Sequence, residues 1–424
     1  MLQIQRIRTA PEEIIEGLKK RGIDATETVQ ALIAIDADRR KIRHEMEERQ
    51  AKSNGLAKEI GQLFKSGKGA EAQALKEQTG ILKQEIKELA EQVSAFEEKE
   101  NELLLSLPNV PHASVKAGKD EKDNEEVDRK GEIPSLHDGA KPHWELADEY
   151  NLINFELGVK ITGAGFPVYV NQGARLQRAM INFFLDENRA AGYTEYQVPH
   201  FVNADSGYGT GQLPDKEGQM YEMPIDGLYA IPTAEVPVTN MFRGEIVNAK
   251  DFPIQSTGYT PCFRREAGSY GKDVRGLNRL HQFDKVEIVN ITDADSSYAL
   301  LDEMVAHVAS LLDKLELPYR ILRLCGGDAG FTSALTYDFE VYSAAQERWL
   351  EVSSVSNFET FQANRLKLRY RDADGKTQLC HTLNGSAMAL PRVLASLLEN
   401  HQTAEGIKIP AALVPYTGFD WIKK

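Results

Sequence analysis

The feature that most constrains the fold is a pair of heptad repeats near the N-terminus. Mostly apolar residues recur alternately three and four positions apart, which is the spacing of a coiled-coil seam. The first stripe contains Leu32, Ile35, Arg39, Ile42, Met46, Arg49, Ser53, Leu56, Ile60 and Leu63. The second contains Leu75, Thr79, Leu82, Ile86, Leu89, Val93, Phe96, Glu100, Leu103 and Leu107. The helix-breaking segment KSGKG at 65–69 separates them, so we expect an antiparallel helical hairpin over about residues 27–105.

Helices of about 35 residues would be roughly 50 Å long, too long for the core of an ordinary domain. We therefore expect the hairpin to project into solvent as an arm. Its tip carries lysines that are candidates for contacts with a nucleic-acid backbone: Lys52, Lys58, Lys65 and Lys68. Alternatively, these lysines only balance the glutamates of a solvated coiled coil. Arg39 and Arg49, inside the seam, could extend their charged ends to solvent.

The chain on either side of the seam indicates the domain organisation. Residues 1–23 read as a short helical start, with Pro11 near a helix N-terminus and Gly22 near its end. Pro108 and Pro111 end the arm, and the charged stretch KAGKDEKDNEEVDRKGE at 116–132 reads as a linker. We therefore predict an N-terminal domain at 1–107, a linker at 108–142 and a second domain at 143–424.

Composition excludes several classes of protein. A chain of 424 residues is longer than one core usually grows, which favours two domains. A net charge of -14 argues against a nucleic-acid coat protein, although a local basic face is enough to bind RNA. Cys262, Cys325 and Cys380 are far apart, which argues against a disulfide framework and fits a reducing cytoplasm. No apolar run reaches the roughly 18 residues of a membrane span, and no secretory or transit signal is evident.

The second domain mixes strand and helix patterns. Short β runs at 196–198, 229–231, 285–291, 319–324 and 350–354 predict strands. Leu176, Met180, Phe183 and Phe184 follow a helical period. This mixture predicts an α+β fold on a largely antiparallel sheet.

The stretch 259–291 reads as two strands joined by a long polar loop. Because side chains alternate along a strand, Arg264 and Glu266 should share one face of the first strand, and Phe283 and Glu287 one face of the second. The loop at 267–280 is too long for a simple hairpin and has the composition of a mobile flap that meets anions. Its cations are Lys272, Arg275 and Arg279. An exposed hairpin with solvated charges is the alternative.

Two further segments are candidates for a binding site. IPTAEVP at 231–237 holds Thr233 and Glu235 between two prolines, a rigid turn that could bind an ammonium or hydroxyl group. An ordinary loop explains it equally well. Pro391 suits the first turn of a helix, where Arg392 would oppose the helix dipole unless a phosphate lies nearby. The alternative is a surface arginine.

Five motifs occur in order behind the hairpin: TAEVP at 233–237, CFRREAGSYG at 262–271, GLNRLHQFDKVE at 276–287, EVSSVSN at 351–357 and TLNGSAMALPR at 382–392. With them the whole chain resembles bacterial-type seryl-tRNA synthetases, a family of class II aminoacyl-tRNA synthetases. The resemblance implies a tRNA-binding coiled-coil arm, followed by a class II catalytic domain on a mainly antiparallel sheet flanked by helices. It also implies ATP-dependent ligation of L-serine to tRNA(Ser), through seryl-adenylate with release of pyrophosphate and then transfer to the 3′-terminal adenosine.

The resemblance implies a nucleotide site for ATP and Mg²⁺. Arg264 would bridge the α-phosphate and the serine carboxylate, Arg392 would lie at the other end of ATP, and both would be catalytic. The implied ATP contacts are Arg264, Arg265, Glu266, Phe283, Glu351, Val352, Ser353, Ser354 and Arg392. Phe283 would stack on adenine, while Glu351 and Ser354 would hold Mg²⁺ with the phosphates. For Glu340, a structural ion pair and a metal role remain equally open.

The resemblance also implies a polar serine pocket. Its members would be Thr233, Ala234, Glu235, Arg264, Glu287, Asn384 and Ser386. Serine is small, so selectivity must come from hydrogen bonds to its hydroxyl group, and we leave open how hydroxyl and ammonium contacts are divided. The loop cations would meet the tRNA acceptor end, and the arm would meet the long variable arm, which is recognised mainly by shape. Family members also charge tRNA(Sec) with serine, which this sequence neither supports nor opposes.

A homodimer is implied as well, because family members bind one tRNA across two subunits. YQVPHF at 196–201 resembles motif 1 at that interface. The chain departs from the family at Gly165, where an arginine is common, and at Ala387 and Pro391, where glycines are common. None of these positions belongs to the residues implied in activation.

Two alternatives stay open. A paralogue could activate a small amino acid for a different carrier, but the arm would then have no RNA to hold. A non-catalytic RNA-binding or scaffold protein could retain a decayed core, but Arg264, Glu287 and Arg392 are all present.

Overall fold

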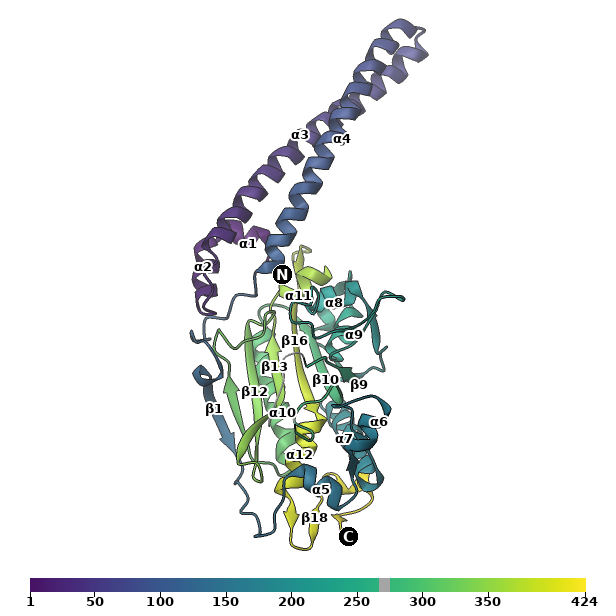
Figure 1. Cartoon of the computed structure of the whole chain (residues 1–424). Coiled ribbons are helices and arrows are strands. Elements are labelled where there is room, and N and C mark those ends of the chain that lie inside the picture. Colours follow the sequence, from purple (N-terminus) through teal and green to yellow (C-terminus); the bar gives the residue numbers. More distant parts are fainter. Residues whose placement is uncertain (267–274) are drawn as a thin grey trace. The chain divides into compact units, whose positions relative to one another are not determined.

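The computed structural model describes residues 1–266 and 275–424 (Figure 1). The chain forms two compact units, one of Met1–Lys19 with Ile23–Pro108, and one of Lys20–Gly22 with Asn109–Lys424. Among the described residues, no helix combines the length and apolar character needed to cross a membrane.

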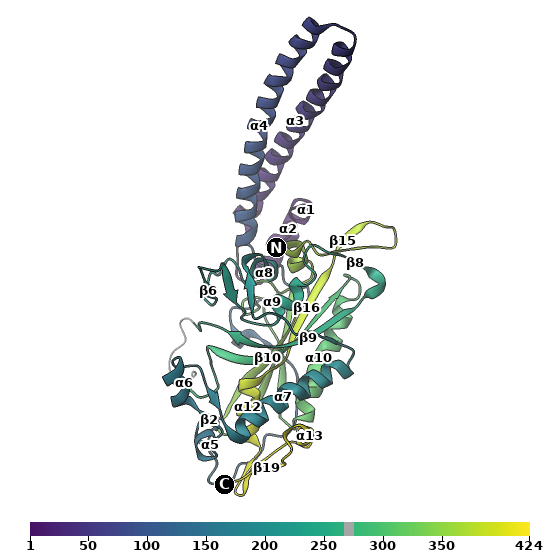
Figure 2. The ribbon, with the colours of Figure 1, turned by 90° about the vertical axis from the view of Figure 1, so that its right-hand side faces the viewer.

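The first unit is helical. It contains α1 (Ile4–Thr9), α2 (Pro11–Lys19), α3 (Thr26–Lys65) and α4 (Gly69–Ser106). The two long helices run side by side as an antiparallel hairpin, which confirms the predicted arm (Figures 1 and 2). Every position of the two predicted stripes is buried or half-buried. Gly67 makes the turn at a φ of 77°, a conformation that glycine adopts without a Cβ clash.

A charged layer interrupts the apolar seam near the base of the arm. Asp36 is fully buried and accepts 2.7 Å hydrogen bonds from both Arg8 and Arg39. Burial alone would raise the pKa of Asp36, but the two arginines hold it below its ordinary value. Arg39 also donates to Glu100 at 2.9 Å, so its charged end is paired within the seam and does not simply extend to solvent.

The second unit is built on an eight-stranded sheet, which confirms the predicted α+β class. Its strands, in spatial order, are β1 (Glu125–Lys130), β11 (Tyr319–Arg323), β12 (Leu335–Ser343), β13 (Arg348–Asn357), β16 (His381–Ala389), β10 (Gln282–Thr292), β9 (Ile254–Phe263) and β4 (Thr194–Glu195). Neighbours in this sheet are antiparallel, except that β4 pairs with β9 in parallel.

Three helices pack against the sheet and form the main core with it: α7 (Asn171–Ala190), α10 (Ser297–Lys314) and α12 (Leu390–Asn400) (Figure 2). The helical period predicted for the second domain is that of α7, whose Leu176 and Met180 are fully buried. On β10, Val286 and Ile288 alternate into this core. The side chains that alternate with them, such as those of Lys285 and Glu287, therefore project from the opposite face of the sheet.

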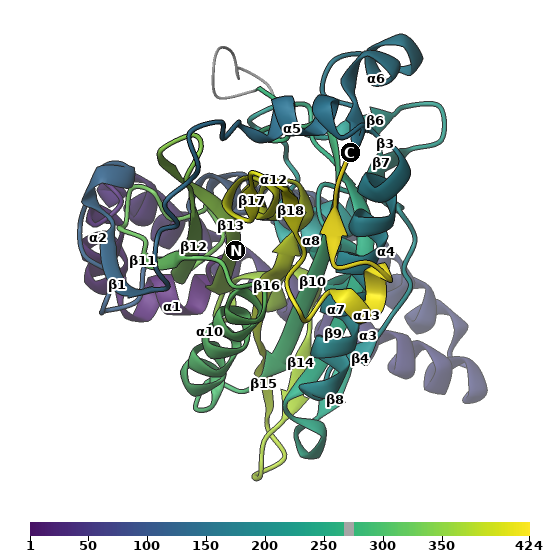
Figure 3. The same ribbon diagram turned by 90° about the horizontal axis from the view of Figure 1, so that it is seen from below.

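Smaller elements complete the unit. Helices α5 (His143–Glu149), α6 (Phe155–Ile161), α8 (Ala204–Thr210), α9 (Glu235–Asn240), α11 (Phe361–Leu366) and α13 (Val414–Thr417) are short. Minor sheets combine β5 (Phe201–Asn203), β7 (Leu228–Ala230) and β6 (Tyr221–Met223); β15 (Thr377–Leu379), β14 (Arg369–Arg371) and β8 (Ile246–Asn248); β17 (Gln402–Thr403), β18 (Gly406–Lys408) and β19 (Trp421–Ile422); and β2 (Ile153–Asn154) with β3 (Val168–Tyr169). Figure 3 shows the C-terminal elements β17, β18 and α13 gathered beside α12 and α7.

The linker predicted at 108–142 is wrong in its middle part. Residues 125–130 form β1, which pairs with β11 at the edge of the large sheet. Five of its six residues are exposed, because an edge strand there needs no apolar face. Its charges are paired instead, as in the 2.5 Å contact between Glu125 and Arg323. A solvated edge strand and a linker have the same composition, so the sequence pattern could not separate them.

The predicted strands differ from the observed ones mainly at their ends. The strand expected at 196–198 is wrong, because β4 ends at Glu195 and only Tyr196 continues the pairing, through a 2.8 Å bond from its N–H to the Thr257 carbonyl. Strands β7, β10, β11 and β13 overlap the other four expected runs. The predicted set lacks β12 and β16, although β16 lies at the centre of the sheet.

Candidate active site

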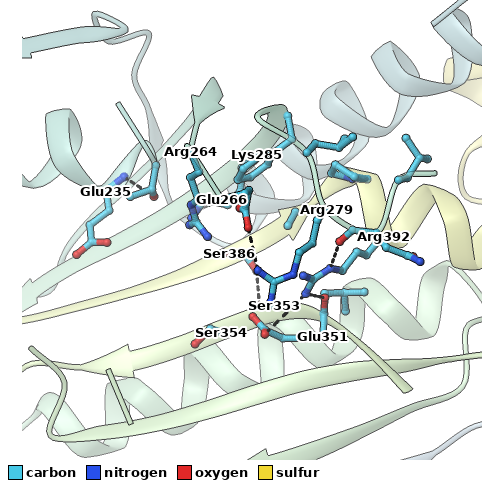
Figure 4. Close-up of a pocket in the computed structure, with 18 of the residues that line it drawn as sticks. Glu235, Arg264, Glu266, Arg279, Lys285, Glu351, Ser353, Ser354, Ser386 and Arg392 are labelled. Atoms are coloured by element: carbon cyan, nitrogen blue, oxygen red, sulfur yellow. Dashed lines mark hydrogen bonds and ion pairs between the residues drawn. The ribbon is translucent and has the colours of Figure 1, made fainter. Parts of the chain in front are cut away.

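A cavity of about 380 Å³ opens over β10, β13 and β16. The structure brings most of the predicted site residues to its wall (Figure 4). They are Thr233, Glu235, Arg264, Glu266, Arg279, Phe283, Glu351, Val352, Ser353, Ser354, Asn384, Ser386 and Arg392. Ala234, Arg265, Arg275 and Glu287 do not line it. Lys272 lies outside the described residues.

Strand alternation carries several of these side chains to the same face. On β10, Phe283 and Lys285 line the cavity, while Val286 belongs to the core. On β16, Asn384 and Ser386 line it, while Leu383 belongs to the core. The period of two therefore explains why polar residues in a buried sheet face one open space.

Two irregularities in pairing adjust this alternation. Along β12 and β13, Phe339 pairs with Ser353 but Glu340 pairs with Glu351, so Val352 is an extra residue. The bulge lets Glu351 and Ser354 both line the cavity although they are three positions apart. Regular alternation would place them on opposite faces.

A second bulge occurs on β16. Ser386 pairs with Glu287 and Ala389 with Lys285, which leaves one extra residue on β16. Ser386 and Ala389 consequently both line the cavity. Bulges of this kind are common beside active sites, where they redirect side chains.

The first strand of the predicted hairpin ends earlier than expected. β9 and β10 pair as far as Phe263 and Gln282. Arg264 lies beyond the strand, and Glu266 has a φ of 48°, so the expectation that these two share a strand face is wrong. Both nevertheless line the same cavity.

One end of the cavity combines an aromatic ring with two cations. The guanidinium carbon of Arg264 lies 5.3 Å from the centroid of the Phe283 ring, and its Nε donates to the Pro232 carbonyl at 3.3 Å. Arg279 donates to Glu266 at 2.9 Å. An aromatic face beside guanidinium groups suits a planar base attached to an anion.

Arg392 lies near the beginning of α12, where Pro391 occupies the first turn as predicted. Its guanidinium donates to the carbonyls of Asn278 at 3.0 Å and Glu351 at 2.9 Å, and lies 3.7 Å from the Glu351 carboxylate. It thus faces the cavity instead of standing alone on the surface.

The donors near Glu351 suit a hard cation shared with phosphate. Glu351 and Ser354 offer oxygen atoms, and one oxygen of the neighbouring Asp338 is buried without a hydrogen-bond partner. Burial, followed by the charge of Glu351, raises the pKa of Asp338 well above its ordinary value. No group of three or more His, Cys, Asp or Glu residues within 1–266 and 275–424 could hold a metal alone. Mg²⁺ characteristically takes few carboxylates together with substrate phosphates, which fits this donor set.

Glu340 has a structural partner instead. Its carboxylate accepts a 2.5 Å hydrogen bond from Arg320 on the neighbouring strand β11. Of the two roles left open by the sequence, the structure therefore favours the ion pair.

The opposite end of the cavity is acidic and polar. Glu235 accepts a 2.7 Å hydrogen bond from Gln362. Burial, followed by the nearby charge of Glu287, raises the pKa of Glu235 to about 7. Thr233, Asn384 and Ser386 add uncharged groups there. Such a site can bind a small ligand that carries an ammonium and a hydroxyl group.

Sequence reasoning missed Lys285, which lines this end. Its ammonium lies 2.7 Å from the Glu287 carboxylate, and both side chains are almost fully buried. The signal was available, because Lys285 lies midway between Phe283 and Glu287 on the same strand face.

Arg275, one of the predicted loop cations, lines a neighbouring cavity of about 770 Å³. The Arg275 guanidinium lies 4.7 Å from the centroid of the Trp144 ring, and both line this space. Gly165 also lines it, with a φ of 82°, and an added Cβ there would lie 2.4 Å from the ring of His281. This close approach explains why glycine replaces the arginine that the resemblance suggested.

The remaining predicted cations lie on the helical hairpin. Lys52, Lys58, Lys65 and Lys68 are all exposed. Lys68 lies 3.3 Å from Glu71, which is one of the local pairings expected on a solvated coiled coil.

Comparisons with known proteins cover the whole chain. Residues 1–111 match the family model of the seryl-tRNA synthetase N-terminal domain, and residues 221–401 match that of the tRNA synthetase class II core domain (G, H, P, S and T). The serine–tRNA ligase of Salinibacter ruber is 54% identical over 99% of this chain and 98% of the relative. That of Akkermansia muciniphila is 46% identical over 100% and 99%.

Solved structures agree with these relatives. The seryl-tRNA synthetase of Pyrococcus horikoshii complexed with ATP has a TM-score of 0.91 at 33% identity, covering 100% of this chain and 99% of the other. The cytoplasmic serine–tRNA ligase of Naegleria fowleri in complex with AMP has a TM-score of 0.86 at 25% identity, with the same coverage.

Proposed function

Because the chain belongs to the seryl-tRNA synthetase family, we propose that its cavity activates L-serine with ATP and then transfers the seryl group to tRNA(Ser). The observation that carries this proposal is one cavity with two chemically different ends. One end holds the Phe283 ring beside the Arg264 guanidinium, and the other holds Glu235 with neutral hydrogen-bonding groups. The first suits a nucleoside triphosphate, and the second suits a small hydroxylated amino acid.

In the first step, a serine carboxylate oxygen attacks the α-phosphorus of ATP. A new P–O bond forms, the bond to the β-phosphate breaks, and pyrophosphate leaves. The carboxylate is already a nucleophile, so the rate depends on positioning and charge neutralisation. Arg264 lies beside the Phe283 ring and between Glu235 and Arg392 in Figure 4, and we assign to it the contacts with both the carboxylate and the α-phosphate. Phe283 and Glu266 hold the adenine, and Arg392 holds the distal phosphates.

Among the other side chains implied in ATP binding, Val352 and Ser353 line the cavity beside Glu351. Arg265 lies outside it, with its guanidinium 4.8 Å from the Tyr221 ring. We place Arg265 among the ATP contacts on the motif match alone.

Mg²⁺ bound by Glu351 and Ser354 would neutralise charge on the phosphates. We expect Glu351→Gln to raise the Mg²⁺ concentration needed for half-maximal activity by about tenfold. Glu340→Gln is the matched control, because Glu340 is paired with Arg320 and does not line the cavity. An equal Mg²⁺ requirement in the two variants would contradict the assignment.

In the second step, a hydroxyl oxygen of the 3′-terminal adenosine attacks the carbonyl carbon of seryl-adenylate, and AMP leaves as the hydroxyl loses its proton. Arg275 and Arg279, with Lys272, are the cations that would meet this end of the tRNA. Domain 1–107, with the arm at 27–105 and its tip lysines, would bind a distant part of the RNA, and residues 143–424 would carry the chemistry. Charging of tRNA(Sec) with serine stays a prediction.

We also propose a homodimer in the cytoplasm. We assign the dimer interface to a groove of about 550 Å³ on α7, β4 and β9. The motif at 196–201 begins in the same groove. Sedimentation velocity should give a mass near twice 47.4 kDa, and a monomer at micromolar concentration would contradict the dimer. The three cysteines, all free and buried, are compatible with a reducing compartment.

A serine-dependent exchange of pyrophosphate into ATP tests the first step. We expect exchange with serine, but not with alanine, because alanine would leave the pocket's polar groups unpaired. No exchange with serine, ATP and Mg²⁺ would contradict the enzymatic proposal and leave the RNA-binding alternative. Exchange without tRNA charging would instead favour the alternative of a different carrier.

A further inference from the structure

We propose that Lys285 is a positioning residue for serine, which acts by fixing the Glu287 carboxylate and by setting the charge of the serine end of the cavity. The inference rests on the proposed function and deepens it. It starts from the 2.7 Å contact between the Lys285 ammonium and the Glu287 carboxylate, whose side chains are only 7% and 2% exposed. The resemblance assigned Glu287 to serine but gave Lys285 no role.

The strand geometry holds this pair in place. Lys285 and Glu287 are two positions apart on β10 and so project from the same face of the sheet. The extra residue on β16 falls between their two partners, Ala389 and Ser386. Lys285 consequently lines the cavity, whereas Glu287 does not. The Ser386 hydroxyl, which does line the cavity, lies 3.5 Å from the Glu287 carboxylate.

The charges around the pair match the two ends of a zwitterion. Once Glu235 is ionised, two carboxylates, Glu235 and Glu287, and one ammonium, Lys285, leave one negative charge at this end to receive the substrate ammonium. Arg264, to which we assign the substrate carboxylate, lines the same cavity. Without Lys285, two buried carboxylates would repel each other, and one would be forced to take up a proton.

The groups that the structure describes around the pair on β9, β16 and α11 are uncharged. From β9, Cys262 faces the pair, and burial raises the pKa of its thiol, so it stays neutral. From β16 and α11, Asn384, Ser386 and Gln362 contribute only uncharged groups. The charge of Lys285 lowers the pKa of Glu235, against burial and Glu287, which raise it.

The test measures KM for serine and for ATP by pyrophosphate exchange with the full chain. Lys285→Met should raise KM for serine about tenfold or more, with KM for ATP within about twofold. The defect should lessen as the pH rises from about 6 to 8.5, because Glu235 then ionises without the help of Lys285. Lys285→Arg, which keeps the charge, should restore most of the affinity for serine. An unchanged KM for serine in Lys285→Met would overturn the proposal.

A double variant separates positioning from direct contact and guards against misfolding, since Lys285→Met alone leaves a buried charge unpaired. If Lys285 acts through Glu287, then Lys285→Met with Glu287→Gln should bind serine at least as well as Glu287→Gln alone. A double variant about tenfold weaker than Glu287→Gln would show that Lys285 contacts serine itself and would overturn the positioning role. If the wild type showed no exchange, the proposed function would fail first, whatever the variants do.

Discussion

Arg279 donates a 2.9 Å hydrogen bond to Glu266 at the wall of the cavity, so a side chain expected to meet tRNA holds one expected to meet adenine. Both residues also line the neighbouring cavity that contains Trp144 and Arg275. The pair is therefore shared by the two spaces. Because we assign Glu266 to ATP and Arg279 to tRNA, single substitutions of the two residues should affect different steps.

We predict that Glu266→Ala raises KM for ATP about tenfold, because it removes the carboxylate that we assign to the adenine. Arg279→Ala should leave KM for ATP within about threefold but raise KM for tRNA by a larger factor. Exchange and aminoacylation assays measure the two effects separately. Equal increases in KM for ATP would show instead that the pair acts as one unit in nucleotide binding.

Arg264→Ala should lower the rate of pyrophosphate exchange by about 100-fold or more, because we assign to this guanidinium alone the bridge between the two reacting groups. The fold should survive, since within residues 1–266 and 275–424 the side chain contributes one hydrogen bond at 3.3 Å and a contact with the Phe283 ring. Arg243→Ala is the control, because its guanidinium donates to Ser206 away from the cavity. Thermal unfolding should be similar in both, and wild-type exchange in the Arg264 variant would refute its role.

The lysines at the tip of the arm should matter for tRNA alone. Replacing Lys52, Lys58, Lys65 and Lys68 by glutamine should raise KM for tRNA and flatten its dependence on salt, with unchanged exchange. The same replacement of the exposed lysines Lys76, Lys83, Lys87 and Lys99 on α4 removes as much charge and is the matched control. Equal effects of the two sets would indicate that only total charge counts.

Removing the whole arm tests its role in tRNA charging directly. Deletion of residues 27–105 should spare exchange and abolish most aminoacylation, because every residue that we assign to activation belongs to the second unit. Unchanged charging of tRNA would contradict the role of the arm.

Glu235 predicts a pH dependence of serine binding. Its pKa is raised to about 7, chiefly by burial, while only the ionised carboxylate attracts the substrate ammonium. KM for serine should therefore rise as the pH falls below about 7. Glu235→Gln should have a higher KM for serine that changes little over this range, and pH profiles of exchange test both. A wild-type KM that stays flat from about pH 5.5 to 8 would contradict the assignment.

The raised pKa of Glu235 also makes the stability of the fold depend on pH, but stability falls with rising pH whereas serine binding improves. Between the ordinary pKa of 4.5 and about 7, the folded protein binds more protons at Glu235 than the unfolded chain. Its contribution to stability therefore falls as the pH rises through this window. Glu235→Gln should remove that contribution, so that the difference in melting temperature between variant and wild type grows from pH 5 to about 8.

Local patterns in the sequence were enough for much of the fold. The heptad spacing predicts both long helices and the turn at Gly67, because the seam of a coiled coil is a property of residue order alone. Hydrophobic period likewise predicts α7 and most of β10. Twelve of the predicted ATP and serine contacts line one cavity, although they come from segments more than 150 residues apart. Only the family resemblance predicted that these segments meet.

What the sequence determined by itself was therefore periodicity and the identity of the reactive side chains. The tertiary structure alone decided how strands pair: the bulge at Val352 that joins Glu351 to Ser354, the edge position of β1, and the partners of Asp36 in the seam. It also decided that Lys285 meets Glu287 inside the cavity. Pairing register and burial depend on segments distant in the chain, so no local pattern encodes them.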